Sequence, residues 1–138
     1  MPNKKKTQAS DNTKSPNLSF SFQYYDTDNN AQYCLSDWAQ ADIKYTLSRL
    51  KEMCSKPIIE MIGKQTYHFF QTNWGSTIYK DGFPDPIKAL NELEPFHFSI
   101  VGLNNQKARV FGALSGSTFY IAWFDYEHKI LPVALKHT

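Results

Sequence analysis

The sequence of 138 residues lacks the features that mark membrane, secreted or zinc-binding proteins. No apolar run approaches the roughly 18 residues that a membrane-spanning helix needs. No apolar segment follows the N-terminal lysines, as it would in a secretory signal. There are two cysteines, and they do not form a C-x-x-C zinc pair. We therefore expect a cytoplasmic protein with reduced thiols and with no membrane partner, metal or cofactor.

Arginine is also scarce, since Arg49 and Arg109 are the only two. This matters because arginine is the usual residue for bidentate phosphate contacts. The formal net charge is +2, but residues 1–17 contain four lysines and a single aspartate. The rest of the chain is therefore slightly acidic, which argues against a broad basic face for nucleic acid. We expect residues 1–17 to be a disordered basic tail and residues 18–138 to form a single α+β domain.

Aromatic residues are plentiful, at 15%, and the first half of the chain combines strand and helix patterns. Residues 18–25 alternate as a strand does, and residues 31–35 fit a second strand that closes a hairpin. Ser36 and Asp37 can serve as N-caps of a long helix that ends near Ser55. Five residues at helical spacing predict its inward-facing stripe: Ala39, Ile43, Leu47, Leu50 and Cys54.

Shorter elements follow in the middle of the chain. Residues 57–64 begin with proline and fit a short second helix. Residues 65–85 are rich in aromatics and fit a packed loop or one extra strand. Asp85 and Pro86 fit the start of a third helix that ends near Leu93. We expect the helices to pack on one face of a sheet.

From residue 96 onward the hydrophobic period changes to two, which predicts an antiparallel β-meander. Its strands are predicted over residues 96–102, 107–113, 118–124 and 129–133. The third is apolar on both faces, which is typical of a central strand, and Pro132 confines the fourth to an edge. A two-residue turn at Ser115 and Gly116 would place Arg109 opposite Ala122. A small residue there leaves room for the guanidinium and a ligand.

The segment from Ala108 to Lys129 carries a recognisable pattern. An Arg109-Val110 strand, a tight turn, an apolar strand and a His128-Lys129 pair follow one another. Together with the element order, this segment resembles the RelE/ParE-like toxin superfamily. The resemblance implies a RelE-like fold and a toxin of a toxin–antitoxin pair. It also implies an endoribonuclease of the mRNA interferase type, with an antitoxin protein, RNA or the ribosome as partners.

Metal-free cleavage of RNA needs a cation at the phosphate and groups that transfer protons. Arg109 suits the phosphate, and His128 suits proton transfer because the pKa of histidine lies near neutrality. We expect Asp125 to orient His128. The other binding residues are predicted to be two aromatic rings that flank Arg109 on its own face and two residues beside His128: Tyr120, Phe124, Tyr126 and Lys129. His97 stays outside this site because the predicted register does not place it on the face of Arg109.

The residues leave alternatives open. Arg109 also fits a structural cation–π contact, and His128 also fits an exposed turn. The slightly acidic body favours a second function, that of a non-catalytic binding module on the same fold. Such a module would contact a protein or nucleic-acid partner, for example as an inhibitor from a mobile element. From the sequence alone, whether the protein is an enzyme stays open.

Overall fold

The computed structural model describes residues 16–27 and 33–132, which form an α+β fold around one five-stranded sheet. Most of the predicted basic tail lies outside the described residues. Within them, no helix has the length and apolar character that a bilayer crossing requires. The sheet order is β1-β5-β4-β3-β2. The strands are β1 (Ser19–Ser21), β2 (Phe70–Gln71), β3 (Glu94–Ser99), β4 (Arg109–Ser115) and β5 (Thr118–Asp125).

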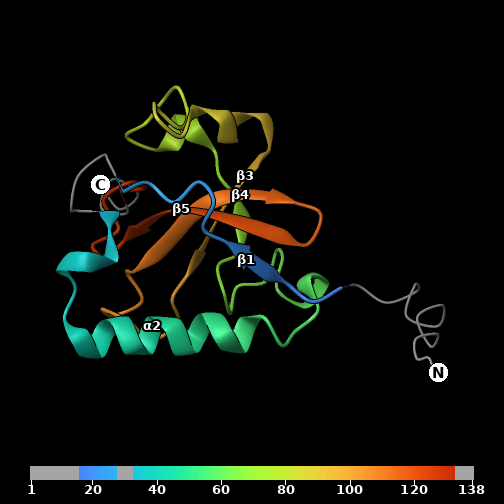
Figure 1. Ribbon diagram of the computed structural model, residues 1–138, viewed down its shortest axis with the longest axis vertical. Coiled ribbons are helices and arrows are strands. Elements are labelled where there is room, and N and C mark those ends of the chain that lie inside the picture. Colours follow the sequence, from blue (N-terminus) through green and yellow to red (C-terminus); the bar gives the residue numbers. More distant parts are fainter. Residues whose placement is uncertain (1–15, 28–32, 133–138) are drawn as a thin grey trace.

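The sheet is mixed rather than purely antiparallel (Figure 1). Strands β3, β4 and β5 form the predicted antiparallel meander, but β1 pairs with β5 in parallel. The chain between β1 and β5 is long, so it can return in either direction. Residues 33–35 and 129–132 are not strands, which corrects two predicted strands as far as they are described. Residues 31, 32 and 133 lie outside the described residues.

The β4–β5 hairpin turns one residue later than predicted. Gly116 and Ser117 form the turn, and Ser115 pairs with Thr118. Gly116 has a left-handed φ of 61°. The first position of a type II′ hairpin turn needs such a φ, and glycine adopts it without strain. The glycine therefore sets the turn one position further along the chain.

A β-bulge between Phe111 and Gly112 then shifts the pairing of the two strands by one more residue. Gly112 allows a close approach here, because a Cβ atom would lie 2.0 Å from a carbonyl oxygen of the partner strand. As a result Arg109 pairs with Asp125. The prediction that Arg109 faces Ala122 is wrong, since the sequence pattern revealed neither the bulge nor the later turn.

The long predicted helix is confirmed as α2 (Gln40–Met53). Its N-cap is Ala39, which has no side chain to accept a hydrogen bond. The predicted caps Ser36 and Asp37 instead lie in the 3-10 helix Leu35–Asp37, which precedes α2. The chain therefore enters α2 through a short helical turn rather than through a capping side chain.

The inward face of α2 is rotated relative to the predicted stripe. Its buried residues are Thr46, Leu50 and Met53, whereas Leu47 is 49% exposed. Tyr45 donates a hydrogen bond to a backbone carbonyl in the β3–β4 connection, which helps to fix the rotation of the helix. Tertiary contacts thus decide which residues point inward, and hydrophobic spacing alone did not reveal them.

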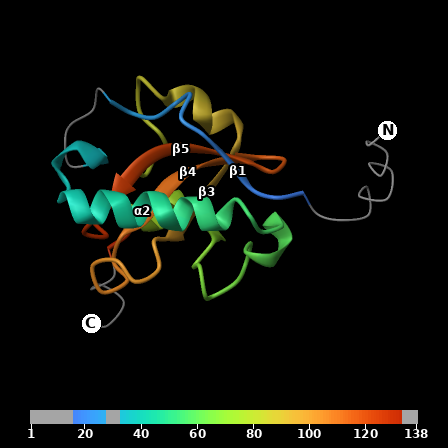
Figure 2. The ribbon, with the colours of Figure 1, turned by 60° about the horizontal axis from the view of Figure 1, so that its bottom comes forward.

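The two faces of the sheet have different covers (Figures 1 and 2). Helix α2 lies against one face, as predicted, and closes an apolar core that includes Leu50, Val110 and Phe124. The segment over residues 72–93 covers the other face, where its apolar side chains pack on Phe111 and Trp123. The predicted helices over 57–64 and 85–93 are 3-10 helices, Ile58–Glu60 and Lys88–Glu92. The second of them lies in the cover opposite α2.

Candidate functional site

Arg109 begins β4 and is a buried cation, with 8% of its surface exposed. Its Nη1 donates to the Oγ of Ser99, 3.1 Å away, and to the carbonyl oxygens of Gln106 and Ala108. Among the described residues, no carboxylate pairs with it, and neither Nε nor Nη2 has an acceptor. Burial lowers its pKa, although the charge of Asp125 opposes this. A buried cation without an ion pair is costly, and an anionic ligand would offset that cost.

Arg109 lines a cavity of about 760 Å³ between the sheet and the segment over residues 72–93. We call it the histidine cavity. Its polar lining consists of residues that donate hydrogen bonds or carry protons: Gln65, His68, Ser76, Lys80, His97, Arg109 and His128. No aspartate or glutamate is among the lining residues in the described part of the chain. Such a lining favours anions.

His97 reaches the histidine cavity from β3 and is 8% exposed. Its Nδ1 lies 2.9 Å from the Oγ1 of Thr72, and its ring stacks on Phe111 with the centroids 5.1 Å apart. Because Nδ1 has this partner, Nε2 is the ring nitrogen left for a ligand. Burial, followed by the charge of Arg109, lowers the pKa of His97 to about 4. The ring is therefore neutral at pH 7 and can accept a proton.

The placement of His97 corrects the sequence-based prediction. The β3–β4 register pairs Ser99 with Arg109 and His97 with Phe111. Side chains of directly paired residues project on the same side of a sheet, and so do those of alternate residues. His97 and Arg109 therefore share a face. The prediction was wrong because it used the β4–β5 hairpin alone and could not include the irregular β3–β4 connection.

His128 comes from the turn after β5, where it has a left-handed φ of 62°. It lines the same cavity, and its Nδ1 is buried without a hydrogen-bond partner in the described residues. Burial and then the charge of Arg109 lower its pKa, while Asp125 and the backbone carbonyls of His128 and Leu131 oppose this. An anion bound at Arg109 would offset the repulsion between the guanidinium and a protonated His128, and it would therefore favour the protonated ring.

Asp125 acts on this site through the backbone. Its Oδ1 accepts from the N–H of Lys129 at 3.0 Å, and its Oδ2 accepts from the N–H of Ile130 at 2.7 Å. Burial raises the pKa of this carboxyl, although both N–H groups oppose the shift. Asp125 thus holds the turn that carries His128, and no hydrogen bond joins it to the imidazole ring in the described residues. This is turn chemistry with a positioning effect.

Of the two aromatic residues predicted to flank Arg109, Tyr120 lies on the same face of the sheet, but neither lines the histidine cavity. Phe124 is fully buried and belongs to the core under α2, on the opposite face of the sheet. The prediction that it shares the face of Arg109 is therefore wrong, because the bulge changes the register. Tyr120 is half-buried and packs edge-on against Tyr24, with the centroids 5.7 Å apart. It is not among the residues that line the histidine cavity.

Tyr126 and Lys129 line a separate cavity of about 350 Å³. The hydroxyl of Tyr126 donates to the Oδ2 of Asp42 at 2.8 Å. This hydrogen bond is the main reason that the pKa of Tyr126 is raised. Tyr126 therefore ties α2 to the end of β5. Of the predicted site residues, the structure brings Arg109 and His128 together in one cavity.

Besides His97, four polar residues of the histidine cavity were not predicted: Gln65, His68, Ser76 and Lys80. His68 has a left-handed φ of 50°, and its ring lies 6.3 Å from that of Phe70. The Nζ of Lys80 donates to the carbonyl of Gly75 at 2.7 Å. All four come from the irregular stretch over residues 65–85. In the sequence, the high density of aromatic and polar residues there indicates a packed segment. It does not indicate which side chains reach the cavity.

A cavity with three histidines invites comparison with metal sites. In the stretches that the structure describes, no group of three or more histidine, cysteine, aspartate or glutamate side chains is arranged to hold a metal ion. The histidine cavity instead combines a fixed guanidinium with imidazole rings that can exchange protons. That combination suits chemistry at a phosphate group.

A scan against models of protein families gives no match to this chain, and no curated protein or solved structure is significantly similar to it. A function for the histidine cavity therefore has to be inferred from its chemistry and from the resemblance of the C-terminal segment. The fold alone does not decide between catalysis and binding.

Proposed function

We propose that the protein is a toxin-like ribonuclease that cleaves RNA without a metal ion in the histidine cavity. One observation carries the proposal. Arg109 is buried without a carboxylate partner in the described residues, and His97 and His128 line the same cavity. A phosphodiester supplies the missing negative charge, and its cleavage needs the proton transfers that two histidines can provide.

The reaction assigns one role to each residue. The Nε2 of the neutral His97 takes the proton from the ribose 2′-hydroxyl. The 2′-oxygen attacks phosphorus while Arg109 stabilises the charge that develops on the phosphate oxygens. A protonated His128 gives its proton to the leaving 5′-oxygen as the P–O5′ bond breaks. The products are a 2′,3′-cyclic phosphate and a free 5′-hydroxyl.

The biological setting follows from the resemblance to RelE/ParE-like toxins. Free ribonuclease activity in the cytoplasm would arrest growth, so a protein antitoxin would have to block it. Messenger RNA, alone or on the ribosome, would be the target. These expectations depend on the resemblance, whereas the cleavage chemistry depends on the histidine cavity alone.

The test compares the two arginines of the chain. Arg109→Gln removes the proposed phosphate clamp, and Arg49→Gln is its matched control. Arg49 lies on α2 and pairs with Glu52 at 2.8 Å, away from the histidine cavity. We expect the wild type and Arg49→Gln to cleave a 5′-labelled RNA in EDTA and to leave a cyclic phosphate end. Arg109→Gln and His128→Gln should cleave it at least about 100-fold more slowly.

Thermal unfolding of each variant separates a lost group from a lost fold. Activity of folded Arg109→Gln and His128→Gln variants equal to that of the wild type would overturn the site. Tightly controlled expression in cells gives a second readout. Growth should stop with the wild type and Arg49→Gln and continue with the other two variants. Absence of cleavage by the wild type on any RNA would overturn the ribonuclease proposal.

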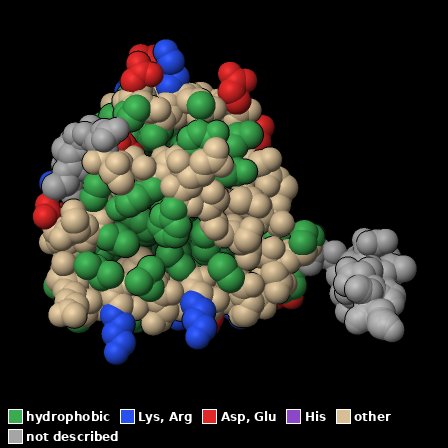
Figure 3. Space-filling view, viewed as in Figure 1, with side chains coloured by type: hydrophobic (Ala, Val, Ile, Leu, Met, Phe, Trp, Pro, Cys, Tyr) green, Lys and Arg blue, Asp and Glu red, His purple; other side chains and the backbone are tan. Residues whose placement is uncertain are grey.

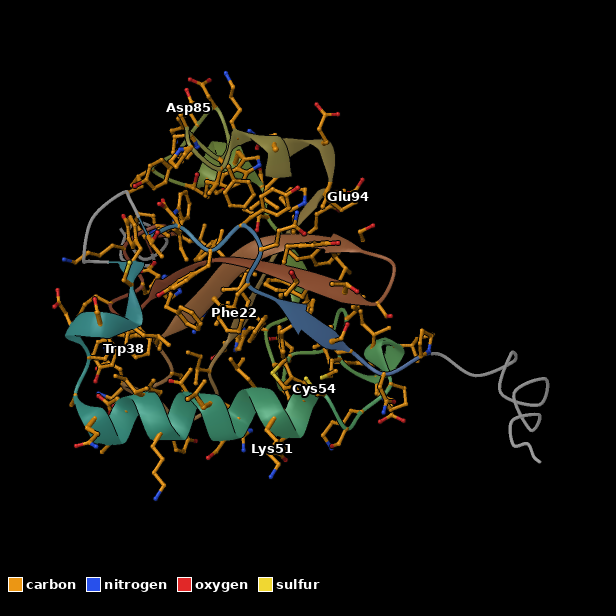
Figure 4. The ribbon with its side chains drawn as sticks, in the orientation of Figure 1. Phe22, Trp38, Lys51, Cys54, Asp85 and Glu94 are labelled. Carbon is orange, nitrogen blue, oxygen red and sulfur yellow. The ribbon has the colours of Figure 1, made fainter. Side chains whose placement is uncertain are left out.

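A second candidate function, a non-catalytic binding module, is favoured by one surface feature. Apolar side chains gather in the middle of the face seen in Figure 3, and two basic side chains border them below. Phe22 lies on this face, above α2 (Figure 4), and it is 49% exposed. An exposed aromatic residue in such a patch suits a protein partner. A stable complex without cleavage products would support this function.

A further inference from the structure

Besides the cavity at Tyr126 and Lys129, another cavity adjoins the histidine cavity, and we call it the second cavity. It has a volume of about 460 Å³. Its lining consists of Asn105, Gln106, Lys107, Arg109, Glu127, His128 and Pro132. Arg109, His128 and Pro132 line both cavities, so these three residues form a common wall. The two groups assigned to the reaction therefore face open space on two sides rather than one.

The loop that forms the outer side of this second cavity is built around Arg109. Asn104, Asn105 and Gln106 all have left-handed φ values, of 50°, 54° and 68°. The carbonyl of Gln106 accepts from the Nη1 of Arg109, and the Nδ2 of Asn104 donates to the carbonyl of Tyr126 at 2.8 Å. These bonds tie the β3–β4 loop to the guanidinium and to the turn that carries His128. The second cavity therefore has a fixed position relative to the wall.

The charges of the second cavity suit a further phosphate group. Lys107 is exposed and has no ion pair among the residues that the structure describes. Glu127 supplies one negative charge, and it is exposed to solvent, where its repulsion is screened. A flexible lysine on a solvated rim is a common partner of a phosphate that needs positioning and not chemistry.

We propose that the second cavity is a subsite for the neighbouring nucleotide of a single-stranded RNA that crosses the wall. This inference rests on the proposed function. The scissile phosphate lies at Arg109 and His128, with one nucleotide in each cavity, and Lys107 binds the next phosphate of the strand. A duplex does not fit this arrangement, because its stacked and paired bases cannot occupy two separate cavities.

The test measures binding of RNA that cannot be cleaved, so it does not depend on catalysis. A dinucleotide and a trinucleotide each carry a 2′-O-methyl group on every ribose that precedes a phosphodiester, so that none of their bonds can be cleaved. Lys107→Gln should weaken the trinucleotide about fivefold and leave the dinucleotide unchanged, because only the trinucleotide has the second phosphate. The slope of log affinity against log salt should fall by about 0.7 for the trinucleotide. Lys51→Gln is the control, because Lys51 projects away from the sheet on α2 (Figure 4).

Each outcome has a distinct meaning. Equal affinities for Lys107→Gln and Lys51→Gln, with normal wild-type binding, would overturn the subsite and leave the ribonuclease proposal standing. A loss that is the same for both oligonucleotides would also overturn it, because the effect would not depend on the second phosphate. Failure of the wild type to bind either oligonucleotide would overturn the subsite and the proposed function together.

Discussion

The two sides of the sheet differ in what they bury. Under α2 the buried side chains are apolar, with Thr46 as an exception on the helix itself. The other buried polar side chains of the described residues lie on the opposite side, within the segment over residues 72–93 or beneath it: Asp26, Thr72, Thr77, His97, Ser99, Arg109 and Asp125. A helix satisfies its own backbone and can cover a sheet with apolar side chains alone. An irregular segment offers polar partners and cavities, and a functional site can form there.

The contrast predicts that apolar packing stabilises the side of the sheet under α2. It also predicts that the residues of α2 that the structure buries are the ones that contribute to this packing. Leu50 is 5% exposed, and Leu47, on the same helix, is 49% exposed. Leu50→Ala should lower the free energy of unfolding by about 2–5 kcal/mol through lost packing. Leu47→Ala should change it by less than about 0.5 kcal/mol. Urea denaturation measures both, and equal losses would mean that the helix is rotated toward the stripe expected from spacing.

The loop side should instead show a dependence on pH. His97 has its pKa lowered to about 4 by burial and by Arg109, while an unfolded chain binds the proton near pH 6.5. Between these values the unfolded state holds more protons, so stability falls as pH falls through this window. The loss for His97 should reach about 3 kcal/mol near pH 4. Denaturation curves at pH 7, 5.5 and 4 measure it.

The control for this effect is His97→Gln, which removes the titrating group and keeps a polar side chain. The variant should be less stable at pH 7 because it loses the stacking on Phe111. Its stability should fall less steeply between pH 6.5 and 4 than that of the wild type. Parallel pH profiles for the two proteins would show that His97 is not buried as a neutral ring. The proposed difference in buried polar groups between the two sides of the sheet would then lose its main support.

Local pattern predicted the parts of the fold that depend on nearby residues. Alternation over residues 96–124 identified β3, β4 and β5 to within a few residues, and helical spacing identified α2. The parallel partner of β1 was not predictable, because it depends on contacts between distant parts of the chain. Nor was the rotation of α2, because the hydrogen bond of Tyr45 to the β3–β4 connection is not a sequence pattern.

The site shows the same limit more sharply. Arg109 and His128 could be named from residue type and position, and the structure places both on one cavity. His97 could not be added, because its face depends on the β3–β4 register, which the β4–β5 hairpin does not determine. The position of Gly116 and the bulge at Gly112 shift the β4–β5 register, and this shift moves Phe124 to the face opposite Arg109. A site on a sheet is therefore predicted less reliably than the strands that carry it.

The smallest prediction compares two buried threonines, one on each side of the sheet. The Oγ1 of Thr46 has no hydrogen-bond partner among the described residues, whereas the Oγ1 of Thr72 lies 2.9 Å from the Nδ1 of His97. Valine matches threonine in shape and removes the hydroxyl. Thr46→Val should raise the free energy of unfolding by up to about 1 kcal/mol, because it removes an unpaired polar group. Thr72→Val should lower it by about 1–2 kcal/mol, because the imidazole loses its partner.

Denaturation of both variants in parallel gives the sign of each change. Opposite signs would mean that the buried hydroxyl stabilises the protein on the side of residues 72–93 and destabilises it under α2. Two losses of equal size would mean that Thr46 has a partner as well, and that the sides differ less than their covers do.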